Sequence, residues 1–180
     1  MDLVLYKKEL KLYGIEAGGE LPQETYDRIL AETLIPRAKR RAMHLLEKQD
    51  RSRKNLEEKL RECGYPPLAV EEAVAYVESY HYIDDERYAR NYVRYHQEGK
   101  SKRRIQQDLM QKGIDRDLIA SVLEEDYATS EEGMIRELLQ KKHYDPDTAD
   151  AKERAKMYRF LMGRGFSTGD ISHVLKDMES

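Results

Sequence analysis

Apolar residues recur at helical spacing along most of the chain, and the clearest stretch runs from Lys100 to Leu123. Ile105 and Leu109 lie one turn apart and would form the buried stripe of a first helix. Gly113 can end that helix because glycine adopts the left-handed backbone conformation without strain. Ser101 suits the capping position before it, since a side-chain oxygen there accepts a backbone N–H hydrogen bond. A second helix, capped by Asp115, would bury Leu118, Ile119, Val122 and Leu123.

The same pattern occurs before and after this stretch. A shift of 49 residues toward the N-terminus places Ser101 on Ser52 and Gly113 on Gly64, and a shift of 52 toward the C-terminus places Gly113 on Gly165. Six apolar positions fall on apolar residues in both copies: Ile105, Leu109, Ile114, Ile119, Val122 and Leu123. Self-similarity with a period of about fifty residues indicates an array of like units. Chance similarity between amphipathic helices is the alternative, but it does not explain why capping residues and stop glycines also stay in register.

We therefore expect an all-α protein built from tandem three-helix bundles. Residues 1–36 would form an N-terminal appendage of two short helices, with Pro36 marking its end. The three repeats would occupy residues 37–81, 82–128 and 129–180. A three-helix unit of this size has a thin core, so neighbouring repeats should pack against one another and stabilise one another.

The composition fits small helical units in a reducing compartment. The chain has 180 residues, of which 37% are charged, and its net charge of −3 does not by itself indicate a nucleic-acid partner. The one cysteine, Cys63, is predicted on the inner face of a helix and cannot form a disulfide within the chain. No apolar run approaches the roughly 20 residues needed to cross a bilayer, and no signal peptide is visible. We expect a cytoplasmic protein without a membrane partner.

The residue patterns that carry most enzyme chemistry are missing from the sequence. None of the five histidines forms an i, i+4 pair and a single cysteine cannot build a thiolate cluster, so no metal site is expected. No glycine-rich phosphate loop or nucleophile elbow occurs, and we predict no cofactor and no catalytic residue. The acidic run at residues 84–86 is interpreted as the first turn of a helix, where the helix dipole stabilises carboxylates.

The chain has thirteen tyrosines and no tryptophan. Three of the tyrosines, Tyr88, Tyr92 and Tyr95, share one face of a predicted helix. Such a stripe can stack on the bases of a single-stranded nucleic acid. More often it belongs to the core, with the hydroxyl groups reaching water, and we favour that interpretation here.

Two basic clusters occupy equivalent positions in the first two repeats, each at a predicted helix N-terminus. Because the helix dipole disfavours cations there, folding does not explain them. A positive first turn with free backbone N–H groups would bind an anion such as a phosphate, and a solvated charged face is the alternative. In the third repeat the corresponding cluster has a lower net positive charge, because it includes the acidic residue Glu153. The cluster in the first repeat comprises Arg51, Arg53 and Lys54. The cluster in the second repeat comprises Lys100, Lys102, Arg103 and Arg104. The weaker counterpart in the third repeat comprises Lys152, Arg154 and Lys156.

Charge is also segregated along the chain. Residues 37–61 carry ten basic and four acidic side chains, a net charge of +6, whereas residues 120–150 carry three basic and nine acidic side chains, a net charge of −6. A molecule with one basic and one acidic region can meet a mixed-charge protein surface and DNA together.

Four segments carry motifs that are more specific than helical periodicity. They are residues 42–60 (AMHLLEKQDRSRKNLEEKL), 82–89 (YIDDERYA), 99–105 (GKSKRRI) and 109–114 (LMQKGI). On these segments the chain resembles the bacterial regulatory protein family RecX over about residues 37–178. The resemblance implies an elongated, curved array of three-helix repeats. It also implies binding within the groove of the RecA recombinase filament on DNA, usually with inhibition, direct DNA binding in some members, and no catalytic residues.

Our hypothesis is a monomeric, non-enzymatic modulator of RecA that acts in recombination and DNA repair. Residues of the two basic clusters would face DNA phosphates, single- or double-stranded, or acidic residues of the filament. The alternative is a DNA-binding module whose three-helix units act like helix-turn-helix domains without RecA. A purely scaffolding repeat protein would bind neither. The candidate interface residues are Arg51, Arg53, Lys54, Lys100, Lys102, Arg103 and Arg104.

Overall fold

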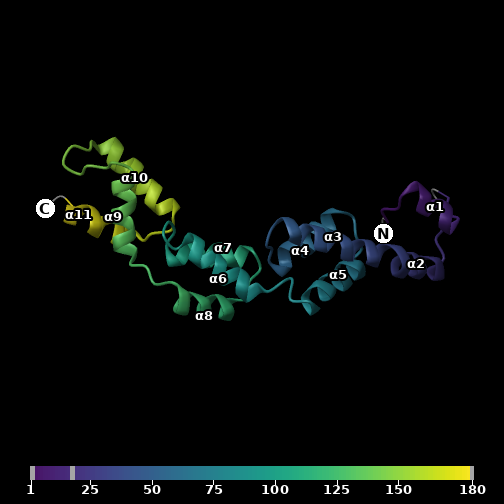
Figure 1. The fold of residues 1–180 in the computed structure, drawn as a ribbon. Helices are drawn as coiled ribbons and strands as arrows, with labels where there is room; N and C mark the ends of the chain where they lie inside the picture. The colour runs from purple at the N-terminus through teal and green to yellow at the C-terminus, as the bar shows by residue number, and fades with distance from the viewer. Residues whose placement is uncertain (1–2, 17–18, 179–180) are drawn as a thin grey trace. The chain divides into compact units, whose positions relative to one another are not determined.

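The computed structural model describes residues 3–16 and 19–178, and every regular element in those two ranges is a helix (Figure 1), which confirms the predicted fold class. The chain divides into two compact units, Met1–Asp85 and Glu86–Ser180. The helices are α1 (Lys7–Tyr13), α2 (Gln23–Ile29), the π-helical turn η1 (Leu30–Leu34), α3 (Ile35–Lys48), α4 (Arg53–Glu62), α5 (Pro67–Ser79), α6 (Asp85–His96), α7 (Lys102–Gln111), α8 (Arg116–Asp126), α9 (Glu131–Lys141), α10 (Ala151–Gly163) and α11 (Thr168–Met178).

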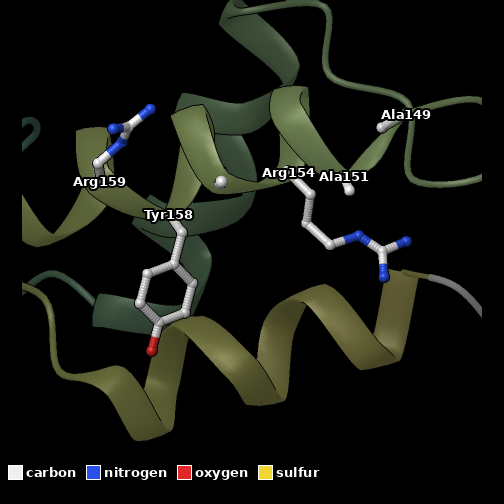
Figure 2. Close-up of a pocket in the computed structure, with 6 residues that line it drawn as sticks. Ala149, Ala151, Arg154, Tyr158 and Arg159 are labelled. Atoms are coloured by element: carbon white, nitrogen blue, oxygen red, sulfur yellow. The ribbon is translucent and has the colours of Figure 1, made fainter.

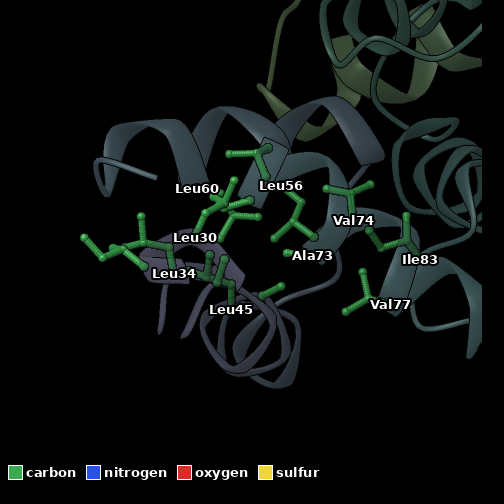
Figure 3. Close-up of a cluster of buried hydrophobic side chains, with 14 residues drawn as sticks. Leu30, Leu34, Leu45, Leu56, Leu60, Ala73, Val74, Val77 and Ile83 are labelled. Carbon is green, nitrogen blue, oxygen red and sulfur yellow. The ribbon is translucent and has the colours of Figure 1, made fainter. Parts of the chain in front are cut away.

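The first unit is built around α3, α4 and α5, whose apolar faces meet in one core (Figure 3). Leu56 and Leu60 of α4 are fully buried there, as the repeat pattern predicts. Small buried residues, Ala38 and Ala42 on α3 and Ala73 on α5, allow these two helices to pack closely. Burying each leucine contributes about 1.5–3 kcal/mol, which holds the three short helices together.

The predicted helix boundary at Pro36 is wrong. The helical run continues from α2 through η1 into α3, and Pro36 lies in the first turn of α3. The N–H group of Ile35 donates to the carbonyl of Leu30, five residues back, so the turn before the proline is wider than an α-helical turn. A widened turn accommodates a residue that lacks an N–H group and would otherwise clash with the preceding turn. The continuous helix also buries Ile29 and Leu34.

The second unit contains two three-helix groups, α6–α8 and α9–α11, each with its own buried cluster. Tyr127, between α8 and α9, packs against both clusters. The two groups are also joined through backbone atoms. The Ser101 N–H donates to the carbonyl of Arg164 at 3.1 Å, and the Arg164 guanidinium donates to the carbonyl of Gly99 at 2.7 Å. Neighbouring repeats therefore pack together in this unit, as their thin cores require.

The stop glycines adopt the predicted left-handed conformation, with φ of 83° at Gly64, 82° at Gly113 and 92° at Gly165. Gly165 has a second reason to be glycine. A Cβ at this position would lie 2.5 Å from both Ser101 Oγ and Arg104 Cβ. The third repeat thus approaches the start of α7 more closely than any side chain at position 165 would permit.

Two residues predicted to lie inside are on the surface. Cys63 is exposed, because α4 ends at Glu62 and Cys63 belongs to the turn that follows it. Tyr95 is 84% exposed, so the tyrosine stripe is core only in part. Tyr88 and Tyr92 are half-buried, and their rings stack with centroids 6.3 Å apart.

Candidate nucleic-acid and protein interface

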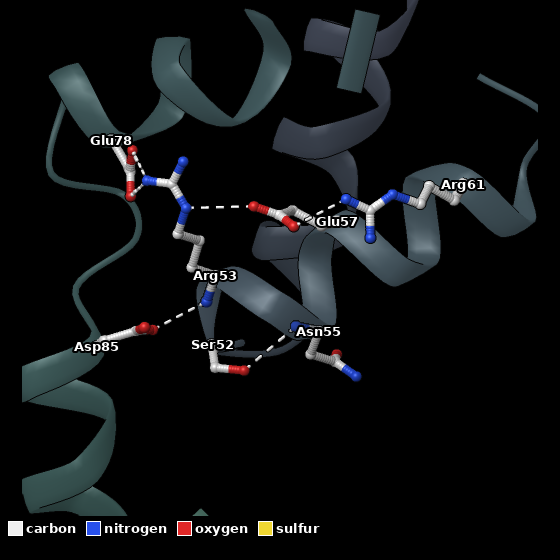
Figure 4. Close-up of polar contacts among 7 residues, drawn as sticks. All are labelled: Ser52, Arg53, Asn55, Glu57, Arg61, Glu78 and Asp85. Carbon is white, nitrogen blue, oxygen red and sulfur yellow. Dashed lines mark hydrogen bonds and ion pairs between the residues drawn. The ribbon is translucent and has the colours of Figure 1, made fainter. Parts of the chain in front are cut away.

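Arg53, in the first turn of α4, is held by carboxylates of its own unit (Figure 4). Its Nη1 donates to both carboxylate oxygens of Glu78 at 2.6 Å, and its Nε donates to Glu57 at 3.2 Å. Glu57 also accepts from Arg61 at 3.0 Å. Partial desolvation lowers the pKa of Arg53, but the hydrogen bonds and charges of Glu78 and Glu57 outweigh it and raise that pKa. Arg53 therefore links α4 to α5 rather than extending freely toward a partner.

The equivalent site in the second repeat is organised by a buried acid, Asp108 of α7. Its carboxylate accepts from Lys100 Nζ at 2.8 Å and from the Tyr92 hydroxyl at 3.0 Å, and it pairs with Arg104 Nε at 3.1 Å. Burial alone would raise the pKa of Asp108, but the bonds from Lys100 and Tyr92 and the two positive charges hold it below its usual range. Lys100 and Arg104 are consequently part of an internal ion network.

At both helix starts the first backbone N–H group already donates to a carboxylate, so it is not one of the free donors that the sequence prediction assumed. The Arg53 N–H donates to Asp85 at 2.8 Å, and the Lys102 N–H donates to Glu131 at 2.8 Å. Each acceptor is the first residue of a helix, Asp85 of α6 and Glu131 of α9. The capping serines, confirmed as predicted, accept a further N–H group each: Ser52 from Asn55 at 3.3 Å and Ser101 from Arg104 at 3.1 Å.

The remaining candidate residues differ in whether their side chains contact other residues of the protein. Arg51 is half-buried and donates from Nη1 to Asn55 at 2.6 Å. The Nζ atom of Lys54 lies 3.9 Å from Oε1 of Glu58, one turn further along α4. Within residues 3–16 and 19–178, the exposed side chains of Lys102 and Arg103 have no charged partner. The structure thus brings the seven cations to two helix starts but leaves these two as the ones most available to another molecule.

Helix α10 carries a basic surface that the sequence alone does not indicate clearly. Its start holds Lys152 and Lys156, which the neighbouring Glu153 seemed to neutralise, and one turn further lies Arg159. An open groove of about 680 Å³ runs beside this helix (Figure 2). The helical spacing of these cations was visible in the sequence, but only the folded chain shows that no carboxylate within residues 3–16 and 19–178 pairs with Lys152, Lys156 or Arg159. The groove is lined by Ala149, Ala151, Arg154, Ala155, Tyr158 and Arg159.

The fold and these surfaces define a class, a tandem three-helix repeat protein with charged helix starts. In the described ranges no group of three or more His, Cys, Asp or Glu residues could hold a metal ion. The helices described there also include none long and apolar enough to cross a membrane.

Comparison with known proteins identifies the family. Residues 38–76 match the family model for the first three-helix domain of RecX, residues 84–123 that for the second, and residues 130–175 that for the third. The chain belongs to the RecX family, and the resemblance inferred from its motifs is confirmed.

Relatives of similar length support this assignment. Regulatory protein RecX of Vibrio campbellii is 35% identical over 151 residues, covering 83% of this chain and 96% of that protein. Regulatory protein RecX of Caldanaerobacter subterraneus is 31% identical over 166 residues, covering 91% and 82%. A crystal structure of regulatory protein RecX has a TM-score of 0.66 at 25% identity, covering 95% of this chain and 87% of that one. RecX from Lactobacillus salivarius has a TM-score of 0.58 at 23% identity, covering 81% and 97%, and shares the fold.

Proposed function

We propose that this protein is a non-enzymatic regulator that binds RecA recombinase filaments on DNA and inhibits recombinase activity. The observation that carries the proposal is the presence of all three RecX domains, in order, between residues 38 and 175. The relatives are named regulatory proteins, which supports a role in control rather than catalysis. We further propose that the protein acts in the cytoplasm as a monomer, because the filament itself supplies the repeated binding sites.

The two basic clusters divide into binding and positioning roles in this proposal. Lys102 and Arg103 face DNA phosphates or acidic filament residues, since their exposed side chains have no charged partner in the described ranges. Arg53, Lys100 and Arg104 hold the helix starts in place through their carboxylate partners. Arg51 and Lys54 flank the first start, in the first unit, and add positive charge there.

Charge reversal tests the binding role. Lys102→Glu/Arg103→Glu should weaken binding to RecA filaments on single-stranded DNA by about tenfold or more at 50 mM salt, and the difference should shrink at 200 mM salt because screening weakens exposed charges. Co-sedimentation with preformed filaments in the presence of ATP measures this. The control variant Lys7→Glu/Lys8→Glu, in α1, introduces the same change in charge elsewhere on the exposed surface.

The outcomes separate the residue assignment from the function. If the α7 variant binds filaments like the wild type, Lys102 and Arg103 are not the contact residues. If the wild-type protein neither binds RecA filaments nor slows RecA-dependent strand exchange, the proposed function is wrong.

The alternative, a helix-turn-helix module acting without RecA, fits the surface less well. The candidate recognition helix of the second repeat is α8, which buries Ile119, Val122 and Leu123. Its eleven residues, RDLIASVLEED, contain one basic and four acidic side chains. A net charge of −3 on the helix that would enter the major groove opposes binding to DNA phosphates.

A further inference from the structure

Helix α3 is the most basic helix in the described ranges. It contains five basic residues and one acidic residue, α10 four and one, and α7 three and one, giving net charges of +4, +3 and +2. Arg37 and Lys39 pair with glutamates of the first unit. Arg40 and Arg41 are exposed, and no carboxylate of residues 3–16 or 19–178 pairs with them. The fold of the first unit therefore leaves part of the positive charge of α3 available to another molecule.

An open groove of about 510 Å³ runs along this helix. Its other side is formed by Tyr76 of α5, the helix that packs against α3. The residues that α3 contributes recur at intervals of three and four positions, so they form one helical face over a rise of roughly 16 Å, the length of three helical turns. These residues are Pro36, Lys39, Arg40, Met43, His44 and Glu47.

The apolar lining of the groove continues beyond it as a row of tyrosines. Pro36 and Met43 are half-buried, and 37% of Tyr76 is exposed. The Tyr76 ring meets the Tyr80 ring edge-on, with centroids 5.1 Å apart, and Tyr80 stacks on Tyr82 at 5.9 Å. Tyr80 and Tyr82 are more exposed than Tyr76. A continuous exposed apolar surface with a polar rim is typical of a site that contacts another protein.

The charges around the groove disfavour a polyphosphate ligand. Glu47 lines one end, and Glu72 lies 3.6 Å from Lys39 Nζ. The same Nζ atom lies over the Tyr76 ring, 5.2 Å from its centroid, which leaves at most one ring face for a base. A protein segment can instead place a carboxylate at Arg40 and an uncharged residue beside Glu47. Charge complementarity therefore favours a protein ligand with a few acidic side chains at defined positions.

We propose that this surface, the α3–α5 groove, binds a short amphipathic helix of a partner protein. An apolar side chain of that helix lies between Met43 and Tyr76, and a neighbouring carboxylate pairs with Arg40. Methionine adapts its shape to different apolar partners, and arginine and tyrosine often supply much of the binding energy in protein interfaces. None of the lining residues belongs to the two basic clusters. The site goes beyond the proposed function, because its ligand requires neither RecA nor DNA.

Fluorescence anisotropy of a labelled helical peptide with the full chain tests the site, in the absence of RecA and DNA. The probe has about twelve residues, with leucine on one helical face and glutamate beside it. Arg40→Glu should weaken its binding about tenfold at low salt, and by less at about 200 mM salt, where exposed charges are screened. The control Lys8→Glu makes the same change of charge at an exposed position of α1 and should leave the affinity unchanged.

Variants of Tyr76 test the apolar contact separately from charge. Tyr76→Ser should weaken peptide binding about tenfold or more at both salt concentrations, whereas Tyr76→Phe, which keeps the ring, should bind like the wild type. Circular dichroism establishes that each variant is folded. The methionine methyl signals of the wild-type protein locate the site even if the serine variant does not fold. The Met43 signal, assigned with Met43→Leu, should shift more on peptide addition than those of the other methionines.

Competition experiments complete the test. The unlabelled peptide should displace the probe, whereas a peptide of the same composition in scrambled order, or an oligothymidylate of the same charge, should displace it poorly. Equal displacement by either competitor would overturn the proposal, and in the second case the groove would belong to a nucleic acid. Wild-type affinity in Arg40→Glu, or a larger shift at a methionine other than Met43, would also overturn it. Because RecA is absent from every measurement, failure here leaves the filament proposal to its own test.

Discussion

At the residue scale, Asp108 changes the role of the basic cluster around it. An acid in the middle of α7, with Ile105 and Leu109 beside it, reads in the sequence as an ordinary surface residue. In the structure it is 8% exposed and engages Lys100, Tyr92 and Arg104. The sequence offered no structural role for Lys100 and Arg104, and their ion pairs with Asp108 supply one. The repeat pattern does not predict this network, because the position equivalent to Asp108 in the first repeat is Lys59 rather than an acid.

Replacing this acid tests its structural role. Asp108→Asn should lower the free energy of unfolding at pH 7 by about 1–3 kcal/mol, since Lys100 and Arg104 lose a charged hydrogen-bond acceptor. Urea unfolding followed by circular dichroism measures the loss. The exposed pair formed by Arg136 and Asp177 provides the control, and Asp177→Asn should cost no more than about 1 kcal/mol. Equal stability of the Asp108 variant and the wild type would contradict this role.

The same network predicts a pH dependence. Because the pKa of Asp108 is lower in the folded protein than its ordinary value, folding favours the ionised carboxylate. Its stabilising contribution is complete above the ordinary aspartate pKa of about 3.9 and is lost as pH falls through the lower folded value. The stability difference between the wild type and Asp108→Asn should therefore narrow below about pH 4. Urea titrations at pH 7, 5 and 3.5 would reveal a constant difference if the carboxylate does not titrate in this way.

At the element scale, helix ends were more predictable than helix continuity. Ser52, Ser101 and the stop glycines act locally, through their own side chains or backbone angles, so a short sequence window contains the whole cause. The helix passes Pro36 through a widened turn, and it buries Ile29 and Leu34. That burial depends on α3 meeting the rest of the first unit, which no local pattern encodes.

The junction between the second and third repeats can be tested at Gly165. Gly165→Ala should destabilise the protein by more than Gly14→Ala, because both positions have positive φ but only the Gly165 Cβ would meet neighbouring atoms, at 2.5 Å. We expect about 1 kcal/mol for position 14 and about 2–4 kcal/mol for position 165.

Urea unfolding provides the free energies for this pair of variants, and hydrogen exchange locates the effect. Exchange of the Ser101 amide, which donates to the Arg164 carbonyl, should accelerate only in the Gly165 variant. Equal destabilisation by the two substitutions would mean that backbone strain alone, and not close packing, requires glycine at position 165.

At the scale of the whole molecule, the distribution of charge matters more than its total. A net charge of −3 gives no sign of a polyanion partner, and the acidic region at residues 120–150 hides the basic helix that follows it. Pairing decides which cations remain available. Arg53, Lys100 and Arg104 are internally paired, whereas Arg103 and Lys156 are exposed and, in the described ranges, without a carboxylate partner.

The all-α class, the three repeats, their caps and the family could be predicted from the sequence, because these follow from local periodicity and short motifs. Which cations pair with carboxylates could not be predicted in this way, because the partners come from other helices. Glu78, Asp85 and Glu131 are at least 25 residues from the groups they bind, and such distant pairings arise only when the helices pack. The same packing places Tyr158 beside α11 and leaves the cationic face of α10 open, so the candidate interface became visible only in the folded chain.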